Sequence, residues 1–100
     1  MKVHTEAIQF KADSKLLTFI ERKLFKMDQF FDKIIDANVV LKLENSGQVR
    51  DKVVEVRLNV PGDVLVAKET NKTFEASVDA ATDALKKQLL KYKERLRKRN

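Results

Sequence analysis

The stretch that decides the fold reads Val54-Glu55-Val56-Arg57-Leu58-Asn59-Val60-Pro61-Gly62-Asp63. Apolar and polar side chains alternate up to Val60, and this period of two predicts a strand with one buried face. Pro61 and Gly62 suit the central positions of a type II turn, because proline fixes φ and glycine accepts a positive φ. A second strand is therefore expected to return antiparallel over Asp63 to Thr70. Its apolar run leaves open which of its faces is buried.

A similar alternating stretch lies upstream of this hairpin. Every second residue is apolar: Ile35, Ala37, Val39, Leu41 and Leu43. The stretch predicts another half-buried strand, and residues 44–48 (ENSGQ) supply the turn that follows it. Short connections between these three strands favour antiparallel pairing. Residues 2–9 alternate more weakly and indicate a first strand at the start of the chain.

Two further stretches have helical spacing. In the first, the apolar stripe is Leu16, Ile20, Leu24, Met27 and Phe31. It predicts a helix over residues 14–31, with Asp13 or Ser14 as the capping residue. In the second, the stripe is Phe74, Val78, Ala81, Leu85, Leu89, Tyr92 and Leu96. Thr73 can cap this helix, and the stripe predicts that its core-facing side extends as far as Leu96.

The predicted order is β-α-β-β-β-α, an α+β two-layer sandwich in which both helices pack on one face of a four-stranded sheet. One hundred residues, 43% hydrophobic and 36% charged, make a single domain over residues 1–100. The absence of cysteine excludes disulfides and thiolate chemistry. The longest apolar run covers only residues 64–67, whereas a membrane span needs about 20. We therefore expect a cytoplasmic protein without a signal peptide.

Positive charge is concentrated at one end of the chain. The net charge is +6, and residues 86–100 alone carry +7, whereas residues 1–85 carry −1. Such a block attracts polyanions, with nucleic acid as the first candidate. It is either a frayed, solvated tail or a rigid basic helix. The apolar stripe that continues to Leu96 favours the helix.

At 100° per residue, the basic side chains of the last helix divide into three groups. Lys87, Lys91 and Lys98 point away from the core, Lys86, Lys93 and Arg97 line one flank, and Arg95 and Arg99 line the other. On the first helix, one flank carries Phe19, Lys23, Lys26 and Phe30, with Arg22 beside it. Such a flank can stack bases and pair phosphates. Spacing alone favours the simpler interpretation, in which the two rings pack at the edge of the core.

Residues suited to catalysis or metal binding are few. His4 lies on a strand and has only Glu6 at a relevant spacing, so it is a poor candidate for a catalytic base. Asp79 and Asp83 are suitably spaced for a hard cation, but ion pairs with Lys86 and Lys87 are the simpler expectation. We predict no catalytic residue, no metal, no cofactor and no small-molecule substrate.

Three strings in order carry a family resemblance. They read RKLFKMDQFFD at 22–32, VVLK at 39–42, and VD at 78–79 followed by DALKKQLLKYK at 83–93. Over about residues 1–98 the chain resembles the ribosome hibernation-promoting factors, short ribosome-associated inhibitors of bacteria in the sigma-54 modulation protein family. The resemblance implies the same sandwich fold. It also implies binding to the small ribosomal subunit, in the channel for messenger and for tRNA at the A and P sites.

In this family, such binding silences idle ribosomes during slow growth or starvation, and short members promote inactive paired ribosomes. The resemblance implies that basic residues of both helices face ribosomal RNA: Arg22, Lys23, Lys26, Lys86, Lys87, Lys91, Lys93 and Arg97. Lys87 stands where an arginine is common, and Lys86 adds charge at a variable position. Glu75 replaces a tyrosine of many members. We expect neither the second, dimerising domain of long members nor the extended tail of the variant that opposes pairing.

Three other functions compete with this one. A generic domain for double-stranded RNA, without ribosome specificity, shares the order α-β-β-β-α. Binding to a membrane surface through the last helix is less favoured, because its apolar stripe is needed for the core. An enzyme is the least favoured, given the missing chemistry. The free protein is expected to be a monomer.

Overall fold

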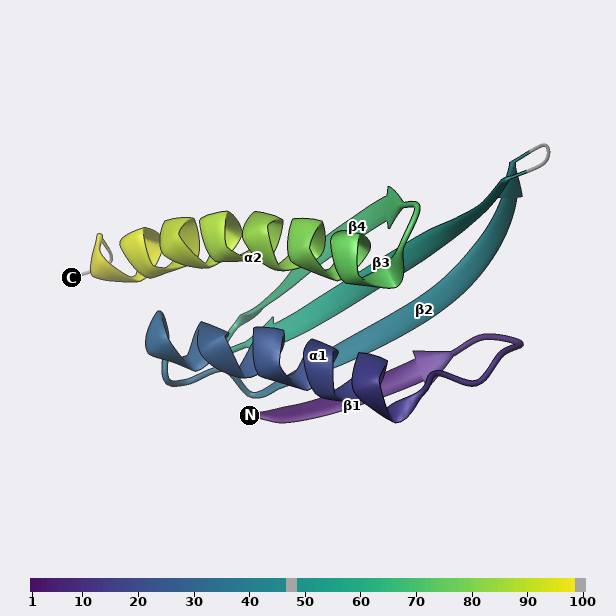
Figure 1. Ribbon diagram of the computed structural model, residues 1–100. Coiled ribbons are helices and arrows are strands. Elements are labelled where there is room, and N and C mark those ends of the chain that lie inside the picture. The colour runs from purple at the N-terminus through teal and green to yellow at the C-terminus, as the bar shows by residue number, and fades with distance from the viewer. Residues whose placement is uncertain (47–48, 99–100) are drawn as a thin grey trace.

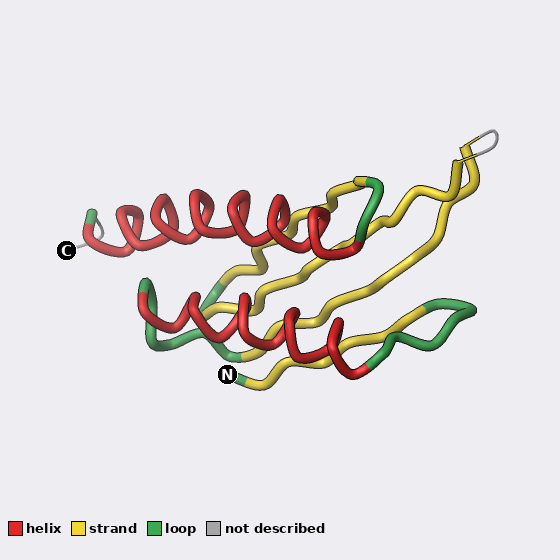
Figure 2. The backbone as a smooth tube through the Cα atoms, in the orientation of Figure 1, coloured by secondary structure: helices red, strands yellow, loops and turns green. Residues whose placement is uncertain are grey.

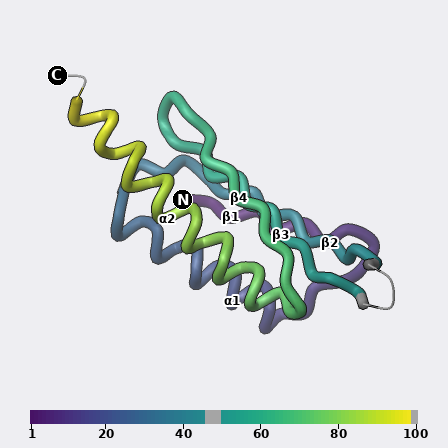
Figure 3. The backbone as a smooth tube through the Cα atoms, turned by 90° about the horizontal axis from the view of Figure 1, so that it is seen from above, coloured from purple at the N-terminus to yellow at the C-terminus, as the bar shows by residue number. Residues whose placement is uncertain are grey.

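Two helices lie side by side on one face of a four-stranded sheet in the computed structural model, which describes residues 1–46 and 49–98 (Figure 1). The elements are β1 (Lys2–Ala7), α1 (Ser14–Phe25), the 3₁₀ helix η1 (Lys26–Gln29), β2 (Asp36–Ser46), β3 (Val49–Val60), β4 (Asp63–Asn71) and α2 (Phe74–Arg97). Seen from above, both helices lie on the same side of the strands (Figure 3). The predicted α+β sandwich is confirmed.

The strands follow one another across the sheet in the order β1-β2-β3-β4. β1 pairs parallel with β2, and the two pairings from β2 to β4 are antiparallel, as predicted. Gly62 connects β3 to β4 with φ +78°, the left-handed value expected for the turn. β2 and β3 continue past their neighbours, because β1 pairs only as far as Leu41 and β4 only as far as Lys52 (Figure 2).

The core forms between the sheet and the helices. The predicted inner face of β3 is buried, and β4 contributes Leu65 and Ala67 while Val64 and Val66 are 41% and 42% exposed. The buried face of β4, which its apolar run had left open, is therefore the one that carries Leu65 and Ala67. The helices begin where predicted, because Asp13 accepts a hydrogen bond from the Leu16 amide and Thr73 accepts one from the Ala76 amide.

Two predicted boundaries differ in the N-terminal part of the chain. β1 ends at Ala7 because Gln9 adopts φ +63°, which is incompatible with a strand. The first helix ends at Phe25 and tightens into η1, so Lys26 begins a 3₁₀ turn, and the following segment to residue 31 is not α-helical.

The predicted apolar face of β2 begins too early. Ile35 precedes the strand and is 57% exposed, whereas its neighbour Ile34 is buried. Residues 44–46 of the expected turn at 44–48 instead continue β2. Gly47 and Gln48, together with the predicted flank position of Arg99, lie outside the described residues.

The core-facing side of α2 ends one turn earlier than predicted. Tyr92 is the last buried residue of the helix, and Leu96 is 39% exposed because α2 extends past the sheet there (Figure 1). The hydroxyl of Tyr92 donates a hydrogen bond to the carbonyl of Pro61, and Arg95 forms an ion pair with Asp63 at 3.2 Å. Both contacts attach the basic end of α2 to the β3–β4 turn.

Candidate nucleic-acid interface

The helix layer carries all eight basic residues predicted to contact RNA. Six of them are exposed, and Lys23 and Lys93 are half-buried. α1 and η1 supply Arg22, Lys23 and Lys26, and α2 supplies the other five. We call this set the helix-layer cations.

Contacts on opposite sides of α2 fix its orientation. Gln88 donates a hydrogen bond to the carbonyl of Val66 at 2.9 Å, so this side of the helix faces β4. On the other side, the ammonium of Lys86 lies 4.6 Å from the ring centroid of Phe30, just after η1. The predicted flank that begins with Lys86 therefore faces the first helix. Lys93 follows seven residues later on the same flank.

A groove of about 160 Å³ separates α1 and η1 from α2. Three helix-layer cations line it, namely Lys23, Lys26 and Lys86, together with Phe30 and Thr82. The structure thus brings these three cations to one groove, where Lys86 covers Phe30 while the ammonium of Lys23 lies 5.9 Å from the ring centroid of Phe19. Arg22 lies outside this groove, at a shallow hollow on the outer side of α1.

A wider groove of about 520 Å³ lies on the β4 side of α2. Lys91 lines it, above Leu65. Lys98 and the ion-paired Arg95 line it as well, and neither belongs to the predicted set. The helix-layer cations therefore spread from the groove between the helices, over the outer side of α2, to this second groove.

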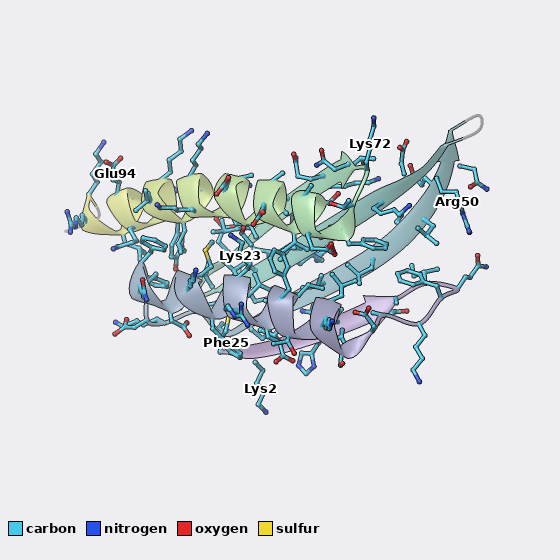
Figure 4. The ribbon with its side chains drawn as sticks, viewed as in Figure 1. Lys2, Lys23, Phe25, Arg50, Lys72 and Glu94 are labelled. Carbon is cyan, nitrogen blue, oxygen red and sulfur yellow. The ribbon has the colours of Figure 1, made fainter. Side chains whose placement is uncertain are left out.

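Lys23 forms an ion pair with Asp79 of α2, with 2.6 Å between the ammonium and the carboxylate (Figure 4). The expected ion pairs within α2 are therefore wrong: Asp79 pairs with the other helix because it lies on the flank that faces α1, and among the described residues Asp83 forms no ion pair with Lys86 or Lys87, which lie three and four residues beyond it. Within residues 1–46 and 49–98, no ion pair involves the other seven helix-layer cations. Those seven charges remain available to an anionic partner.

The two aromatic residues of the α1 flank pack against the core at its edge, so the simpler interpretation of Phe19 and Phe30 is confirmed. Phe30 also borders the groove, and this second environment depends on a contact with α2. Sequence spacing indicated the flank but gave no sign that Lys86 would cover the ring.

The opposite face of the sheet carries charges of both signs. Exposed positions there include Lys2 and Glu6 on β1, Arg57 on β3 and Lys68 on β4. Lys2 projects away from the helices (Figure 4). Positive charge is therefore concentrated on the helix layer, and that side is the candidate surface for a polyanion.

The described part of the chain offers neither a cluster of metal ligands nor a membrane-spanning helix. No group of three or more histidine or acidic residues is placed to hold a metal ion there. Within the same residues, none of the helices has both the length and the apolar character needed to cross a membrane.

A four-stranded sheet backed by two helices that carry exposed cations defines an α+β domain with a candidate surface for an anionic partner. The chain belongs to the family described as sigma 54 modulation protein / S30EA ribosomal protein, whose model matches residues 3–97. This family assignment confirms the resemblance seen in the sequence. The family is one of ribosome-associated proteins.

Individual relatives agree with this assignment. The chain is 40% identical over 81 residues to the ribosome hibernation promotion factor of Deinococcus radiodurans, covering 80% of this chain but only 42% of that protein. It is 32% identical over 95 residues to the ribosome hibernation promoting factor of Pseudomonas putida, covering 95% and 89% of the two chains. In fold, it matches a ribosomal subunit interface protein from Coxiella burnetii with a TM-score of 0.83, at 21% identity and over 94% and 99% of the chains.

Proposed function

We propose that this chain is a cytoplasmic ribosome hibernation factor. It binds the small ribosomal subunit in the channel used by messenger and by tRNA at the A and P sites, and it inhibits translation by occupying that channel. The names of the Deinococcus and Pseudomonas relatives support a role in ribosome hibernation. The channel is what the resemblance to the family implies, and the contacting residues follow from that resemblance together with the distribution of charge.

The observation that carries the proposal is the set of seven helix-layer cations that have no ion-pair partner in the part of the chain that the structure describes. Their side of the molecule contrasts with the mixed charge of the open sheet face. A surface of this kind binds RNA through phosphates and releases counterions, so it needs no sequence readout. Recognition of structured RNA depends mainly on shape and backbone contacts, and a rigid two-helix layer offers a fixed shape.

Rigidity contributes to the proposed mechanism because ordering a flexible tail on binding would cost conformational entropy. In the free protein, α2 is already packed through Leu85, Leu89 and Tyr92, and its end is attached to the β3–β4 turn through Pro61 and Asp63. Most of the basic surface is therefore ordered before it meets the ribosome. Binding then blocks the channel by occupancy, without any chemical step.

Sedimentation through a sucrose gradient tests the proposal. Protein added to bacterial ribosomes should travel with the small subunit and should leave it as the salt concentration rises. Excess duplex RNA should displace little of it, because the proposed site is defined by the shape of the channel. Complete displacement by duplex RNA would instead identify a generic double-stranded RNA-binding domain. Absence of the protein from the ribosomal fractions would refute the proposal.

We further propose that binding favours inactive paired ribosomes, as in the short members that the sequence resembles. The same gradient reports this directly, because paired particles sediment faster than single ones. A new fast-sedimenting peak that contains the protein is expected. Ribosomes that remain single at saturating protein would contradict pairing and leave channel occupancy intact.

A further inference from the structure

Phe30 presents an aromatic ring to the groove between the helices, and a lysine covers that ring. The ring packs against the edge of the core, which fixes its position. Lys86 is exposed, and its ammonium lies 4.6 Å from the ring centroid. A fixed ring beneath a long, flexible cation is a surface that another flat group can use once the cation moves.

The surroundings of the ring match one kind of ligand. Lys26 lines the same groove and has no ion-pair partner among the described residues, and Gln29 and Thr82 add polar side chains at its edge. Asp83 lines the groove as well, so its carboxylate offsets one of the two ammonium charges of Lys26 and Lys86 and a net positive charge remains. Lys23 contributes less free charge, because Asp79 neutralises it. A ring, two available ammonium groups and hydrogen-bonding side chains suit an unpaired nucleotide, whose base can stack while its phosphates meet the cations.

We propose that Phe30 is a stacking surface for one unpaired base of ribosomal RNA. In the free protein Lys86 covers the ring, and on binding Lys86 moves to a backbone phosphate and leaves the ring to the base. This inference rests on the proposed function and deepens it, because it adds an aromatic contact to a surface otherwise defined by charge. It also assigns a role to Lys86.

The exchange is favourable in magnitude. An exposed lysine over a phenylalanine ring contributes about two- to fivefold in an equilibrium constant. Stacking of a base on an aromatic ring contributes about 5- to 150-fold. A new phosphate contact for Lys86 adds to this gain through counterion release. The base and the phosphate together therefore outweigh the contact that is lost.

Binding of purified small ribosomal subunits to Phe30→Leu and Phe30→Tyr tests the ring. Leucine keeps an apolar side chain against the core but neither stacks nor holds Lys86 over a ring, so affinity should fall about tenfold, the stacking gain divided by the lysine contact that wild type gives up. Tyrosine keeps the ring and should bind within about twofold of wild type. The matched control is Phe25→Leu, since Phe25 is 45% exposed, lies outside the groove and should not affect binding.

Lys86→Met tests the movement of the lysine through the salt dependence of the same binding. Loss of one phosphate contact should make the slope of log K against log salt shallower by about 0.7 to 0.9, whereas Phe30→Leu should leave the slope unchanged. A wild-type slope for Lys86→Met would refute the movement of Lys86. Two results would refute the stacking surface: wild-type affinity of Phe30→Leu, or an equal loss of affinity in Phe30→Tyr and Phe30→Leu.

These outcomes are distinguishable from failure of the proposed function. Wild-type protein that does not bind small subunits would refute both proposals together. Wild-type binding with no effect of either Phe30 variant would refute only the stacking proposal. Thermal unfolding of each variant shows whether it still folds. If the Phe30 variants were unfolded, Lys86→Met would still test the proposal, because Lys86 is exposed and its replacement does not disturb the packing at the edge of the core.

Discussion

Replacing Lys87 and Lys91 with glutamate tests whether the outer side of α2 meets RNA phosphates. Both side chains are exposed, and neither forms an ion pair in the described part of the chain. The fold should therefore survive the change. Surface substitutions of this kind usually alter stability by no more than about 0.5 kcal/mol.

The size of the effect follows from counterion release. Each phosphate contact changes the slope of log K against log salt by about 0.7 to 0.9. At about 0.1 M salt, loss of the two contacts lowers affinity by about 25- to 60-fold and makes the slope shallower by about 1.4 to 1.8. Repulsion between the new carboxylates and the phosphates adds to this loss.

The assay is equilibrium binding to small ribosomal subunits at several salt concentrations. The matched control is Lys2→Glu with Lys68→Glu, which makes the same change in net charge on the opposite face of the sheet. This control should lose only the weaker, screened long-range attraction. Near wild-type affinity of the α2 variant, or an equal loss in the control, would refute the assignment of the contact surface to the helix layer.

Three further substitutions test the structural basis of this surface. Gly62→Ala should lower the free energy of unfolding by about 1 to 2 kcal/mol in urea titration. The added Cβ has open space, but φ +78° is strained for alanine. An unchanged urea midpoint would contradict the left-handed conformation of Gly62 in the β3–β4 turn. Tyr92→Phe should lower the free energy of unfolding by about 0.5 to 1.5 kcal/mol, because it removes the hydrogen bond to Pro61, and it should speed amide hydrogen exchange in the last turns of α2. An unchanged exchange rate would show that this bond does not hold the end of the helix. Asp79→Asn should alter stability by less than about 1 kcal/mol, since the pair is partly exposed, and should tighten binding to small subunits by up to about fivefold as Lys23 becomes free; weaker binding would contradict the view that Asp79 competes with phosphate.

Local patterns in the sequence predicted the order of elements and most of the core. The alternation from Val54 to Val60 identified the buried face of β3, and the polar side chains of Asp13 and Thr73 marked where the helices begin. These features depend on neighbouring residues and on the periods of strand and helix. Such features can be read without knowing the tertiary structure.

Features that depend on distant contacts could not be predicted in the same way. The apolar run of β4 fits burial of either face, and the pairing of Leu65 and Ala67 with buried residues of β3 selects the face that lies against the helices. Leu96 keeps the helical period but has no sheet beneath it. Asp79 pairs with Lys23 of the other helix, whereas spacing within α2 had indicated ion pairs inside that helix, with Lys86 and Lys87 one turn beyond Asp83.

For the candidate site, the sequence indicated which residues are basic and which flank of each helix they occupy. The structure adds that one of them, Lys23, is neutralised and that another, Lys86, covers an aromatic ring. Both additions arise from the packing of α1 against α2. They divide a set of similar lysines into members with different expected contributions to binding.

Competition with messenger and tRNA tests the central claim most directly. Small subunits are loaded with messenger and with tRNA in the A and P sites, and binding of the protein is compared with binding to empty subunits under the same salt conditions. Occupation of the channel predicts that loaded subunits exclude the protein and that the protein, when bound first, prevents tRNA from binding. Equal binding of the protein to loaded and empty subunits, with tRNA retained, would contradict the account.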